Sequence, residues 1–305
     1  MDRHVRADDR VRLGFAPMRT WGEARSWGIA RLVTGADPAT AALDADVLLA
    51  FTLGGTKEEV FAHPERRLSA ADDARFVSLV ERRHAGEPVA YLRGFKEFFG
   101  VSLMVDSRVL IPRPETETLV EEALRFIRTL RQAIVVDVGT GSGAIACAIA
   151  VRAPHARVIA TDASADALAV AESNARALGV AARVELRQGD LFAPIGERVD
   201  VVCANLPYLR ADDLASLVGE RTSLAYEPRI AVVAGSDGLD VIRRAVSDTN
   251  RVLAPGGAAF FECDPPQAKA ISALLEAAGL RTRVVRDLAG AERVVAGRSS
   301  GEGRR

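Results

Sequence analysis

The sequence predicts an α/β protein in which residues 113–298 form a mainly parallel, seven-stranded sheet, preceded by a small helical bundle in residues 1–90. Three observations lead to this prediction. Short β-branched or apolar runs alternate with helical patterns after residue 113, which is typical of βαβ units. A glycine-rich loop follows the first of these runs. The segment before residue 90 carries apolar positions at helical spacing.

Five runs are predicted to be parallel strands, and two later runs are predicted to close the sheet as an antiparallel hairpin around Gly290. The five runs are Ile134–Val138, Arg157–Thr161, Val184–Arg187, Val199–Ala204 and Ala258–Glu262, and the two later ones are Arg283–Val285 and Arg293–Val295. A helix is expected over Ala165–Leu178, because Gly179 suits the left-handed position just after a helix end.

Residues 1–90 read as short helices. Asp37 is a good N-cap, Pro38 suits the first helical position, and an apolar stripe follows as far as Gly54. A second helix is expected after Ser69, whose spacing to Asp72 resembles a capping box. Short helices with short connections indicate a bundle. Nothing in this segment carries obvious chemistry, so we interpret it as a docking or scaffolding domain.

Two shorter segments complete the predicted organisation. Residues 91–112 are predicted to form a β-hairpin connector, because apolar and aromatic residues lie on both sides of Gly100. The tail, 299–305, is expected to be disordered.

Composition limits the possible functions. The 305 residues include 40 Lys and Arg against 41 Asp and Glu, a net charge of −1, whereas proteins that grip nucleic-acid phosphates usually show a basic excess. We therefore expect no direct sequence-specific binding of nucleic acid. Cys147, Cys203 and Cys263 form no CxxC pair, which favours buried thiols in a reducing cytosol. No apolar run approaches the roughly 20 residues of a membrane span, and the N-terminus lacks a signal-peptide core, so we expect a cytoplasmic protein without membrane contact.

The glycine loop, Val-Val-Asp-Val-Gly-Thr-Gly-Ser-Gly-Ala at 135–144, connects a predicted strand to a predicted helix. Glycines let the backbone approach a ligand, and the helix N-terminus supplies N–H donors. Because Gly139-x-Gly141-x-x-Ala144 also satisfies the dinucleotide fingerprint, the loop alone leaves a nicotinamide cofactor possible. A P-loop is excluded, since no Gly-Lys-Ser/Thr occurs.

Acidic residues after the first three strands favour S-adenosylmethionine. Asp137 at the first strand end is placed to face a cationic amino acid head group, and Asp190 after the third strand is placed near an adenine edge. Asp162 at the second strand end is placed to accept hydrogen bonds from two ribose hydroxyls, a role that dinucleotide folds share. The repeat of the glycines as G-x-G-x-G points the same way. Strand–helix turns without any ligand remain the alternative.

A second motif, Asn205-Leu206-Pro207-Tyr208, follows the fourth strand, where ligands bind in open parallel sheets. An amide nitrogen is a poor nucleophile because its lone pair is delocalised into the carbonyl. The Asn205 side-chain oxygen and the Leu206 backbone carbonyl are two acceptors that can hold both N–H bonds of such a group. Tyr208 can stack on its flat face. An ordinary Asn-x-Pro turn is the plainer interpretation.

The motif resembles the N-P-P-Y signature of class I, Rossmann-like methyltransferases that act on planar nitrogens, with Leu206 where that family most often has Pro. Further segments resemble the release-factor glutamine methyltransferase family, the HemK/PrmC group, over roughly residues 25–298. These segments are Arg83-x-x-Gly-Glu-Pro-x-Ala-Tyr91, Gly94-x-x-x-Phe-Phe-Gly100, Leu110-Ile-Pro-Arg-Pro-Glu-Thr-Glu117, Glu227-Pro228, Gly235-x-Asp-Gly-Leu239 and Asp287-Leu-Ala-Gly290.

The resemblance implies an N-terminal helical domain that docks the substrate, and methyl transfer from S-adenosylmethionine to the N5 amide nitrogen of the glutamine in a Gly-Gly-Gln loop of peptide chain release factors. S-adenosylhomocysteine would be the product, with no metal. The implied substrate residues are Asn205, Leu206, Pro207 and Tyr208. The expected cofactor residues are Asp137, Gly139, Thr140, Gly141, Ser142, Gly143, Asp162, Asp190, Leu191, Asn205 and, at the mouth of the site, Arg113.

Four other functions stay open from the sequence. A glutamine methyltransferase for a large-subunit ribosomal protein is the nearest, although Pro-Glu-Thr-Glu at 114–117 favours the release-factor type. A DNA or RNA exocyclic-amine methyltransferase would use the same pocket on a flipped base. A nicotinamide dehydrogenase lacks a recognisable hydride site here. A non-catalytic interaction protein is the fourth, but this interpretation does not explain the intact Asn-x-Pro-Tyr motif at 205–208.

Overall fold

The computed structural model describes residues 19–35, 37–218 and 223–301, and the chain divides into two compact units at Gly86 and Glu87. The helix that follows the boundary, α5 (Val89–Arg93), therefore belongs to the second unit. None of the described helices is long and apolar enough to cross a membrane.

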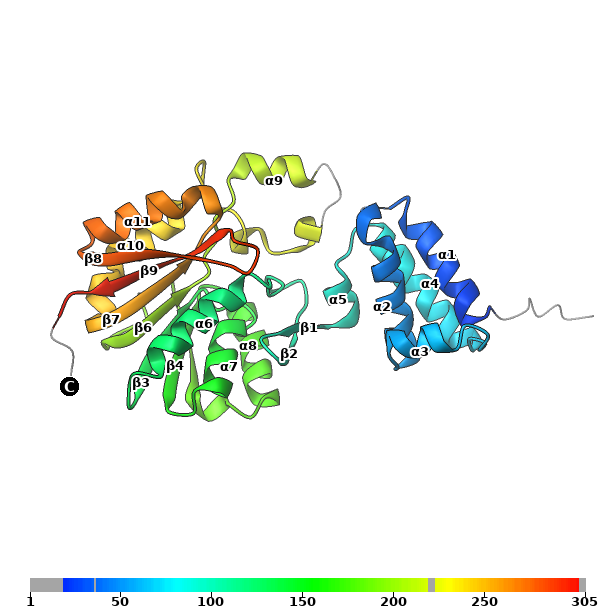
Figure 1. Ribbon diagram of the computed structural model, residues 1–305, viewed down its shortest axis with the longest axis horizontal. Helices are drawn as coiled ribbons and strands as arrows, with labels where there is room; N and C mark the ends of the chain where they lie inside the picture. Colours follow the sequence, from blue (N-terminus) through cyan, green and yellow to red (C-terminus); the bar gives the residue numbers. More distant parts are fainter. Residues whose placement is uncertain (1–18, 36, 219–222, 302–305) are drawn as a thin grey trace, which may run out of the picture. The chain divides into compact units, whose positions relative to one another are not determined.

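The first unit is helical, as predicted from its apolar spacing (Figure 1). Its helices are α1 (Trp21–Leu32), α2 (Ala41–Leu53), α3 (Lys57–Ala62) and α4 (Ala70–His84). Ser69 caps α4 by accepting a hydrogen bond from Asp72 N at 3.1 Å, which confirms that helix start. The start predicted at Asp37 is wrong in detail. Pro38–Thr40 is a single 3-10 turn before α2, and Asp37 makes no side-chain cap.

A buried ion pair lies inside this bundle. Arg83 Nε donates to Asp44 Oδ2 at 2.7 Å, and the two residues are only 8% and 9% exposed. The pair joins α4 to α2, around a core that includes the fully buried Phe76 and Leu48. Because burial removes both charges from water, each is tolerated only while the other is present.

The second unit begins with α5 and the predicted hairpin, β1 (Phe95–Phe98) and β2 (Val101–Met104). Its turn residues Phe99 and Gly100 have φ of +49° and +76°, values that suit a tight two-residue hairpin turn. Asn174 links the hairpin to the glycine loop, since its side chain accepts from Met104 N and donates to the carbonyls of Met104 and Ser142.

The main sheet has seven strands in the order β5-β4-β3-β6-β7-β9-β8, which confirms the predicted mainly parallel α/β fold. The parallel strands are β3 (Ala133–Val138), β4 (Ala156–Asp162), β5 (Val184–Gln188), β6 (Val199–Ala204) and β7 (Leu253–Glu262). The closing antiparallel pair is also confirmed, as β8 (Leu280–Arg286) and β9 (Glu292–Ser299). Of the tail predicted for 299–305, residues 302–305 lie outside the described residues.

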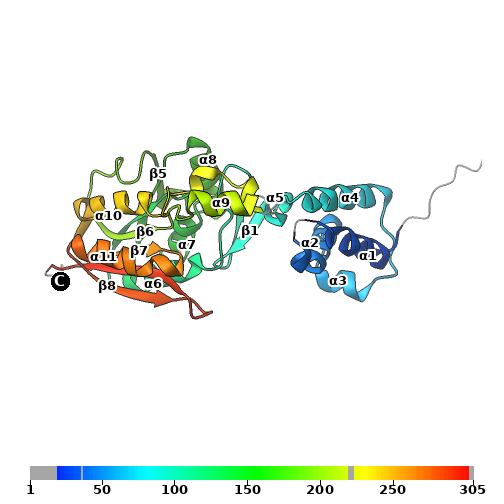
Figure 2. The ribbon, with the colours of Figure 1, turned by 90° about the horizontal axis from the view of Figure 1, so that it is seen from above.

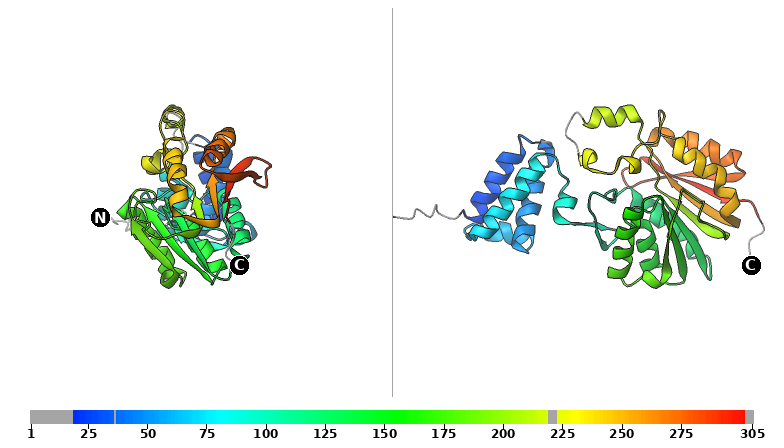
Figure 3. Two further views of the ribbon diagram at one scale, coloured as in Figure 1. Left: turned by 90° about the vertical axis from the view of Figure 1, so that its left-hand side faces the viewer. Right: turned by 180° about the vertical axis from the view of Figure 1, so that it is seen from behind.

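Helices cover both faces of this sheet (Figures 2 and 3). On one face lie α6 (Thr116–Ile127), α7 (Ala144–Arg152) and α8 (Ala165–Ala177), and on the other lie α10 (Asp240–Val252) and α11 (Ala268–Ala277). Alternate residues of each strand enter the two cores, so Val135 packs toward α6 and α7 while Val136 packs toward α10 and α11. All three cysteines are buried, as expected.

The strand order fixes where a site can form. Strand β3 has β4 on one side and β6 on the other. The connections after β3 and β4 lead to α7 and α8 on one face, whereas the connection after β6 leads to α10 on the other. Such a switch point opens a crevice beyond the strand ends. Helix α9 (Ala211–Val218) is the first helix after β6 along the chain.

Replacing Arg83 with leucine should lower the free energy of unfolding by about 3–5 kcal/mol, because the Asp44 carboxylate would remain buried without its partner. The neighbouring Arg82→Leu is the matched control, since Arg82 is exposed on the same helix. Urea denaturation followed by circular dichroism measures both. Equal effects of the two substitutions would show that the ion pair does not stabilise the bundle.

Candidate active site

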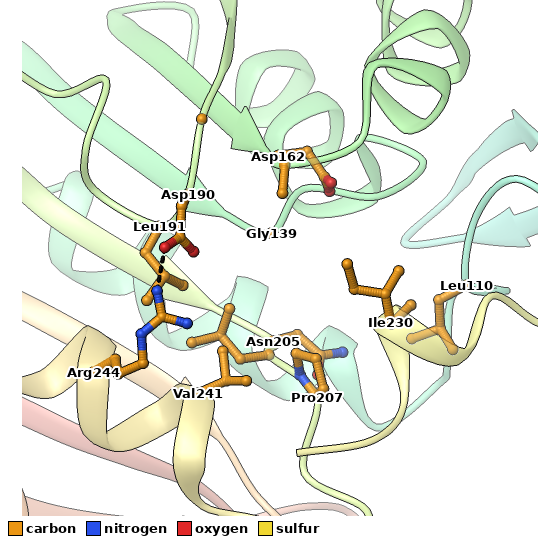
Figure 4. A pocket seen from close by; sticks show the side chains of 14 residues that line it. Leu110, Gly139, Asp162, Asp190, Leu191, Asn205, Pro207, Ile230, Val241 and Arg244 are labelled. Atoms are coloured by element: carbon orange, nitrogen blue, oxygen red, sulfur yellow. Dashed lines mark hydrogen bonds and ion pairs between the residues drawn. The ribbon is translucent and has the colours of Figure 1, made fainter. Parts of the chain in front are cut away.

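A cavity of about 200 Å³ lies at the carboxyl ends of β3 to β6 (Figure 4). In the view of Figure 4, Leu110 and Ile230 lie on one side, and Asp190, Leu191 and Arg244 on the other. The cavity is lined by Leu110, Gly139, Asp162, Ala163, Gly189, Asp190, Leu191, Asn205, Leu206, Pro207, Ile230, Ala231, Val241 and Arg244.

The loop after β3 depends on its glycines. Gly139, Gly141 and Gly143 have φ of +70°, +55° and +78°, a region that residues with a Cβ atom avoid. A Cβ at position 139 would lie 3.0 Å from Cδ2 of Leu206, so glycine also permits the loop to approach the residue after Asn205. The backbone N of Thr140 donates to Thr161 O at 2.9 Å and ties the loop to the end of β4.

Asp137 lies beneath this loop and is fully buried. Its Oδ2 accepts hydrogen bonds from Thr140 Oγ1 at 2.6 Å and from Ala146 N at 3.1 Å. Its Oδ1 has no hydrogen-bond partner among the described residues. Burial raises the pKa of Asp137 to about 7, although the two donors oppose the shift. Asp137 therefore shapes the loop and keeps one oxygen unsatisfied, but it does not line the cavity.

Asp162 ends β4 and does line the cavity. Its Oδ2 accepts from Gly141 N and its Oδ1 accepts from Ser164 N, each at 2.9 Å. These backbone donors fix the orientation of the carboxylate at the cavity wall. Since a carboxylate offers about four acceptor positions, two remain for a ligand that carries hydroxyl groups.

The loop after β5 is held in a strained conformation. Leu191 has a φ of +48°, which is unusual for a residue other than glycine, asparagine or aspartate. Thr161 Oγ1 donates to the Leu191 carbonyl at 3.0 Å and helps to hold it. Asp190 beside it forms an ion pair with Arg244 of α10, and both side chains are more than half exposed (Figure 4). A pair so exposed stabilises little and can exchange for a ligand contact.

Asn205 and Leu206 lie directly after β6, at the floor of the cavity. Asn205 Nδ2 donates to Thr116 Oγ1 at 3.0 Å, at the start of α6. Neither Asn205 Oδ1 nor the Leu206 carbonyl accepts a hydrogen bond from a described residue. The Leu206 side chain is 3% exposed and packs against Gly139, so this residue contributes packing as well as a carbonyl.

A second cavity, of about 170 Å³, shares Asn205, Leu206 and Pro207 with the first and is also lined by Tyr208 and Arg113. Burial raises the pKa of Tyr208 well above its usual range, so the phenol stays neutral. Gln267 Nε2 donates to the Tyr208 carbonyl at 2.9 Å and holds the loop from below.

Glu227 is a buried carboxylate that contacts the wall of this second cavity through Arg113 but does not line the cavity itself. It forms an ion pair with Arg113 and accepts a hydrogen bond from Ile111 N at 2.9 Å. Arg113, predicted at the mouth of the cofactor site, therefore lies on the second cavity and does not line the first. Its segment is held in place by a residue 114 positions away in the sequence.

The structure brings most of the predicted site residues to the two cavities. Those on the first are Gly139, Asp162, Asp190, Leu191, Asn205, Leu206 and Pro207, and those on the second alone are Tyr208 and Arg113. Asp137, Thr140, Gly141, Ser142 and Gly143 form the turn behind the first cavity and do not line it. Among the residues the structure describes, no three His, Cys, Asp or Glu side chains gather as metal ligands would.

Ile230, Val241 and Arg244 form a wall of the cavity that the sequence did not predict. This wall comes from the long connection between β6 and β7, which carries no motif for ligand binding. The feature that marks this wall in the structure is Ile230, a large apolar side chain that lines the cavity and is 69% exposed. A lone exposed isoleucine cannot be recognised from sequence alone.

Comparisons with known families and proteins agree with this geometry. A family profile described as the PrmC N-terminal domain matches residues 23–94, and one described as the methyltransferase small domain matches residues 116–222. A protein of Bordetella pertussis named release factor glutamine methyltransferase is 43% identical, over 86% of this chain and 96% of its own. One of the same name from Xylella fastidiosa is 42% identical, over 88% and 98%.

Solved structures show the same fold. The catalytic domain of hMettl16, in complex with a 3'UTR hairpin, has a TM-score of 0.55 over 77% of this chain and 83% of its own, at 16% identity. At such low identity the likeness concerns the fold alone.

Replacing Gly139 with alanine should destabilise the protein by more than the strain of a left-handed alanine, which is about 1–2 kcal/mol. The added Cβ would press on Leu206 at 3.0 Å. Gly179→Ala is the control, because Gly179 has almost the same φ, +69°, with nothing within 4 Å of its Cβ position. Thermal denaturation of both variants measures the difference. Equal losses would mean that the Gly139–Leu206 approach is not tight.

Proposed function

Since the chain belongs to the family of release factor glutamine methyltransferases, we propose that it methylates the N5 amide nitrogen of the glutamine in the Gly-Gly-Gln motif of peptide chain release factors. The chain is an S-adenosylmethionine-dependent protein-glutamine methyltransferase, and the proposal concerns the identity of the target and the roles of its residues. The observation that carries it is Asn205, whose amide is held so that its oxygen stays free at the cavity floor.

The first cavity fits S-adenosylmethionine on three counts. Glycine at position 139 keeps the cavity open, because a Cβ there would lie 3.0 Å from Cδ2 of Leu206, another residue of the cavity wall. Asp162 presents an oriented carboxylate suited to ribose hydroxyls. Asp137 does not line the cavity, but its buried Oδ1 behind the glycine turn lacks a partner among the described residues and would accept a hydrogen bond from an ammonium group that reached it. When bound, the cofactor supplies an electrophilic methyl group on a positively charged sulfur.

The residues after β6 then have to prepare a poor nucleophile. Asn205 Oδ1 and the Leu206 carbonyl are both unoccupied acceptors, on consecutive residues of one loop. Together they can hold the two N–H groups of a glutamine side chain and turn the nitrogen toward the methyl group. Fixing the nitrogen at roughly 3–3.5 Å from the methyl carbon converts a bimolecular encounter into an intramolecular one.

The second cavity is where we place the rest of the glutamine. It opens from the same three residues, Asn205 to Pro207, and Tyr208 offers a flat, neutral ring to a planar amide. The ion pair with Glu227 fixes Arg113, which also lines this cavity. A nucleobase amine would also suit two acceptors and a ring, so the substrate itself has to be tested.

Incubation of the enzyme and S-adenosylmethionine with purified release factor, followed by peptide mass spectrometry, tests the proposal. A gain of one CH₂ on the Gly-Gly-Gln peptide is expected, located on the glutamine. Large-subunit ribosomal proteins and synthetic DNA or RNA are the comparison substrates. Methylation of one of these, with an unmodified release factor, would replace the proposed target.

Asn205→Ala should slow methyl transfer by about 10²–10³, because one preorganised acceptor for the amide is lost. Cofactor affinity should change little, since Asp162 and the glycine turn remain. Asn250→Ala is the control for the same substitution at an exposed site on α10. Single-turnover kinetics and calorimetric titration with S-adenosylhomocysteine measure the two quantities. Normal turnover in Asn205→Ala would refute amide positioning by this residue.

Asp162→Ala should weaken cofactor binding, because charge-assisted hydrogen bonds of about 1.5–3 kcal/mol each would be lost. Asp166→Ala, exposed two residues into α8, is the matched control. Calorimetric titration with S-adenosylhomocysteine gives both affinities. Since Asp162 also holds Gly141 N, the thermal stability of the variant should be compared as well. An unchanged affinity would mean that another group binds the ribose.

A further inference from the structure

An unexplained carboxylate lies at the carboxyl end of β7. Glu262 is 1% exposed, and neither of its side-chain oxygens has a hydrogen-bond partner among the described residues. Withdrawing a carboxylate from water without a partner costs several kcal/mol. An apolar side chain of similar size would fill the same space at lower cost. Packing alone therefore does not account for a glutamate at this position.

The groups around Glu262 come from four segments. They are Thr116 of α6, Arg113 and Glu115 before that helix, Tyr208 after β6, Arg293 of β9, and Cys263 and Asp264 next along the chain. Burial raises the pKa of Glu262 to about 7, and the Thr116 hydroxyl, Arg293 and Arg113 oppose that shift. The carboxyl group therefore changes its charge close to neutral pH.

Thr116 connects this carboxyl group to the candidate active site. Its buried hydroxyl oxygen accepts a hydrogen bond from Asn205 Nδ2 at 3.0 Å. A hydroxyl carries a single hydrogen, and this contact leaves that hydrogen available. Glu262 lies near enough for the Thr116 hydroxyl to lower its pKa, although the contact falls outside strict hydrogen-bond geometry. The Glu262 carboxylate is therefore a buried acceptor that is available to the hydrogen of the Thr116 hydroxyl.

We propose that Glu262 and Thr116 are positioning residues that set which end of the Asn205 side-chain amide faces the substrate. The Glu262 carboxylate takes the Thr116 hydrogen, so that the Thr116 oxygen can act only as an acceptor toward Asn205 Nδ2. Asn205 Oδ1 is then turned to the target amide. This inference rests on the proposed function, because it assigns a purpose to the orientation of Asn205.

A proton on Glu262 removes the constraint. The protonated carboxyl group can donate to the Thr116 oxygen, and the Thr116 hydroxyl can then donate to Asn205 Oδ1. The Asn205 amide turns over, and its NH₂ group faces the NH₂ group of the substrate. Two donors cannot form a hydrogen bond, so methyl transfer should fall as the pH drops through the pKa of Glu262.

The test compares Thr116→Val, which keeps the shape and removes the hydroxyl, with Thr116→Ser, which keeps the hydroxyl. Thr116→Val should lower single-turnover methylation of release factor about tenfold at pH 8, equivalent to ~1.4 kcal/mol. Thr116→Ser should stay within about threefold, as expected for a retained hydrogen bond. Thr249→Val is the matched control, a fully buried threonine whose hydroxyl donates to Ala245 O at 2.8 Å. Equal rates in Thr116→Val and Thr249→Val would overturn the proposal.

The pH profile separates positioning from mere structural support. The wild type should lose activity below about pH 7, whereas Glu262→Gln, which cannot ionise, should lack this acidic limb. An acidic limb of the same midpoint in Glu262→Gln would overturn the proposal even if Thr116→Val failed to fold.

A readout without catalysis distinguishes this inference from the proposed function. The ¹³C carboxyl signal of Glu262, assigned by its absence in Glu262→Gln, should titrate at a higher pH in Thr116→Val than in the wild type, because the hydroxyl lowers that pKa. An unchanged midpoint would refute the Thr116–Glu262 link whatever the substrate is. Failure of the wild type to methylate release factor, with the shift present, would instead refute the proposed target.

Discussion

The placement of β3 between β4 and β6 is the constraint on which the site depends. Because the connection after β3 leaves toward one face and the connection after β6 toward the other, a crevice opens between their carboxyl ends. The same topology brings the glycine turn, Asp162 and Asn205 together, although they lie in three separate βα connections. Two contacts then close the arrangement, from Gly141 N to Asp162 and from Asn205 to Thr116.

The sheet and the turn after β3 could be predicted because local chemistry decides them. β-branched runs, the positive φ required at Gly139, Gly141 and Gly143, and the cap at Ser69 are each encoded within a few residues. The start of α2 was wrong in detail because Asp37 and Pro38 also suit a 3-10 turn, and its choice depends on packing. The wall around Ile230 and Arg244 depends on how a long connection folds back, which no short pattern records.

Three acidic residues at strand ends show why residue type alone could not give their roles. Two of them, Asp162 and Glu262, are the last residues of β4 and β7, and the third, Asp137, is the next-to-last residue of β3. Asp162 meets two backbone donors at the cavity wall, which suits a carboxylate that binds ligand. Asp137 and Glu262 are buried and keep unsatisfied oxygens. Burial is a property of the whole fold, so the pKa shifts follow only once the helices are in place.

Stability and function make opposite demands on these buried acids. A carboxyl group whose pKa is raised from about 4 in the unfolded chain to about 7 in the folded one favours the folded state most when protonated. Its stabilising effect is full below pH 4 and is lost as the pH rises through 7. The orientation of Asn205 proposed above needs Glu262 ionised, which is the less stable form. The burial that raises the pKa of Glu262 therefore opposes the ionised form that orients Asn205.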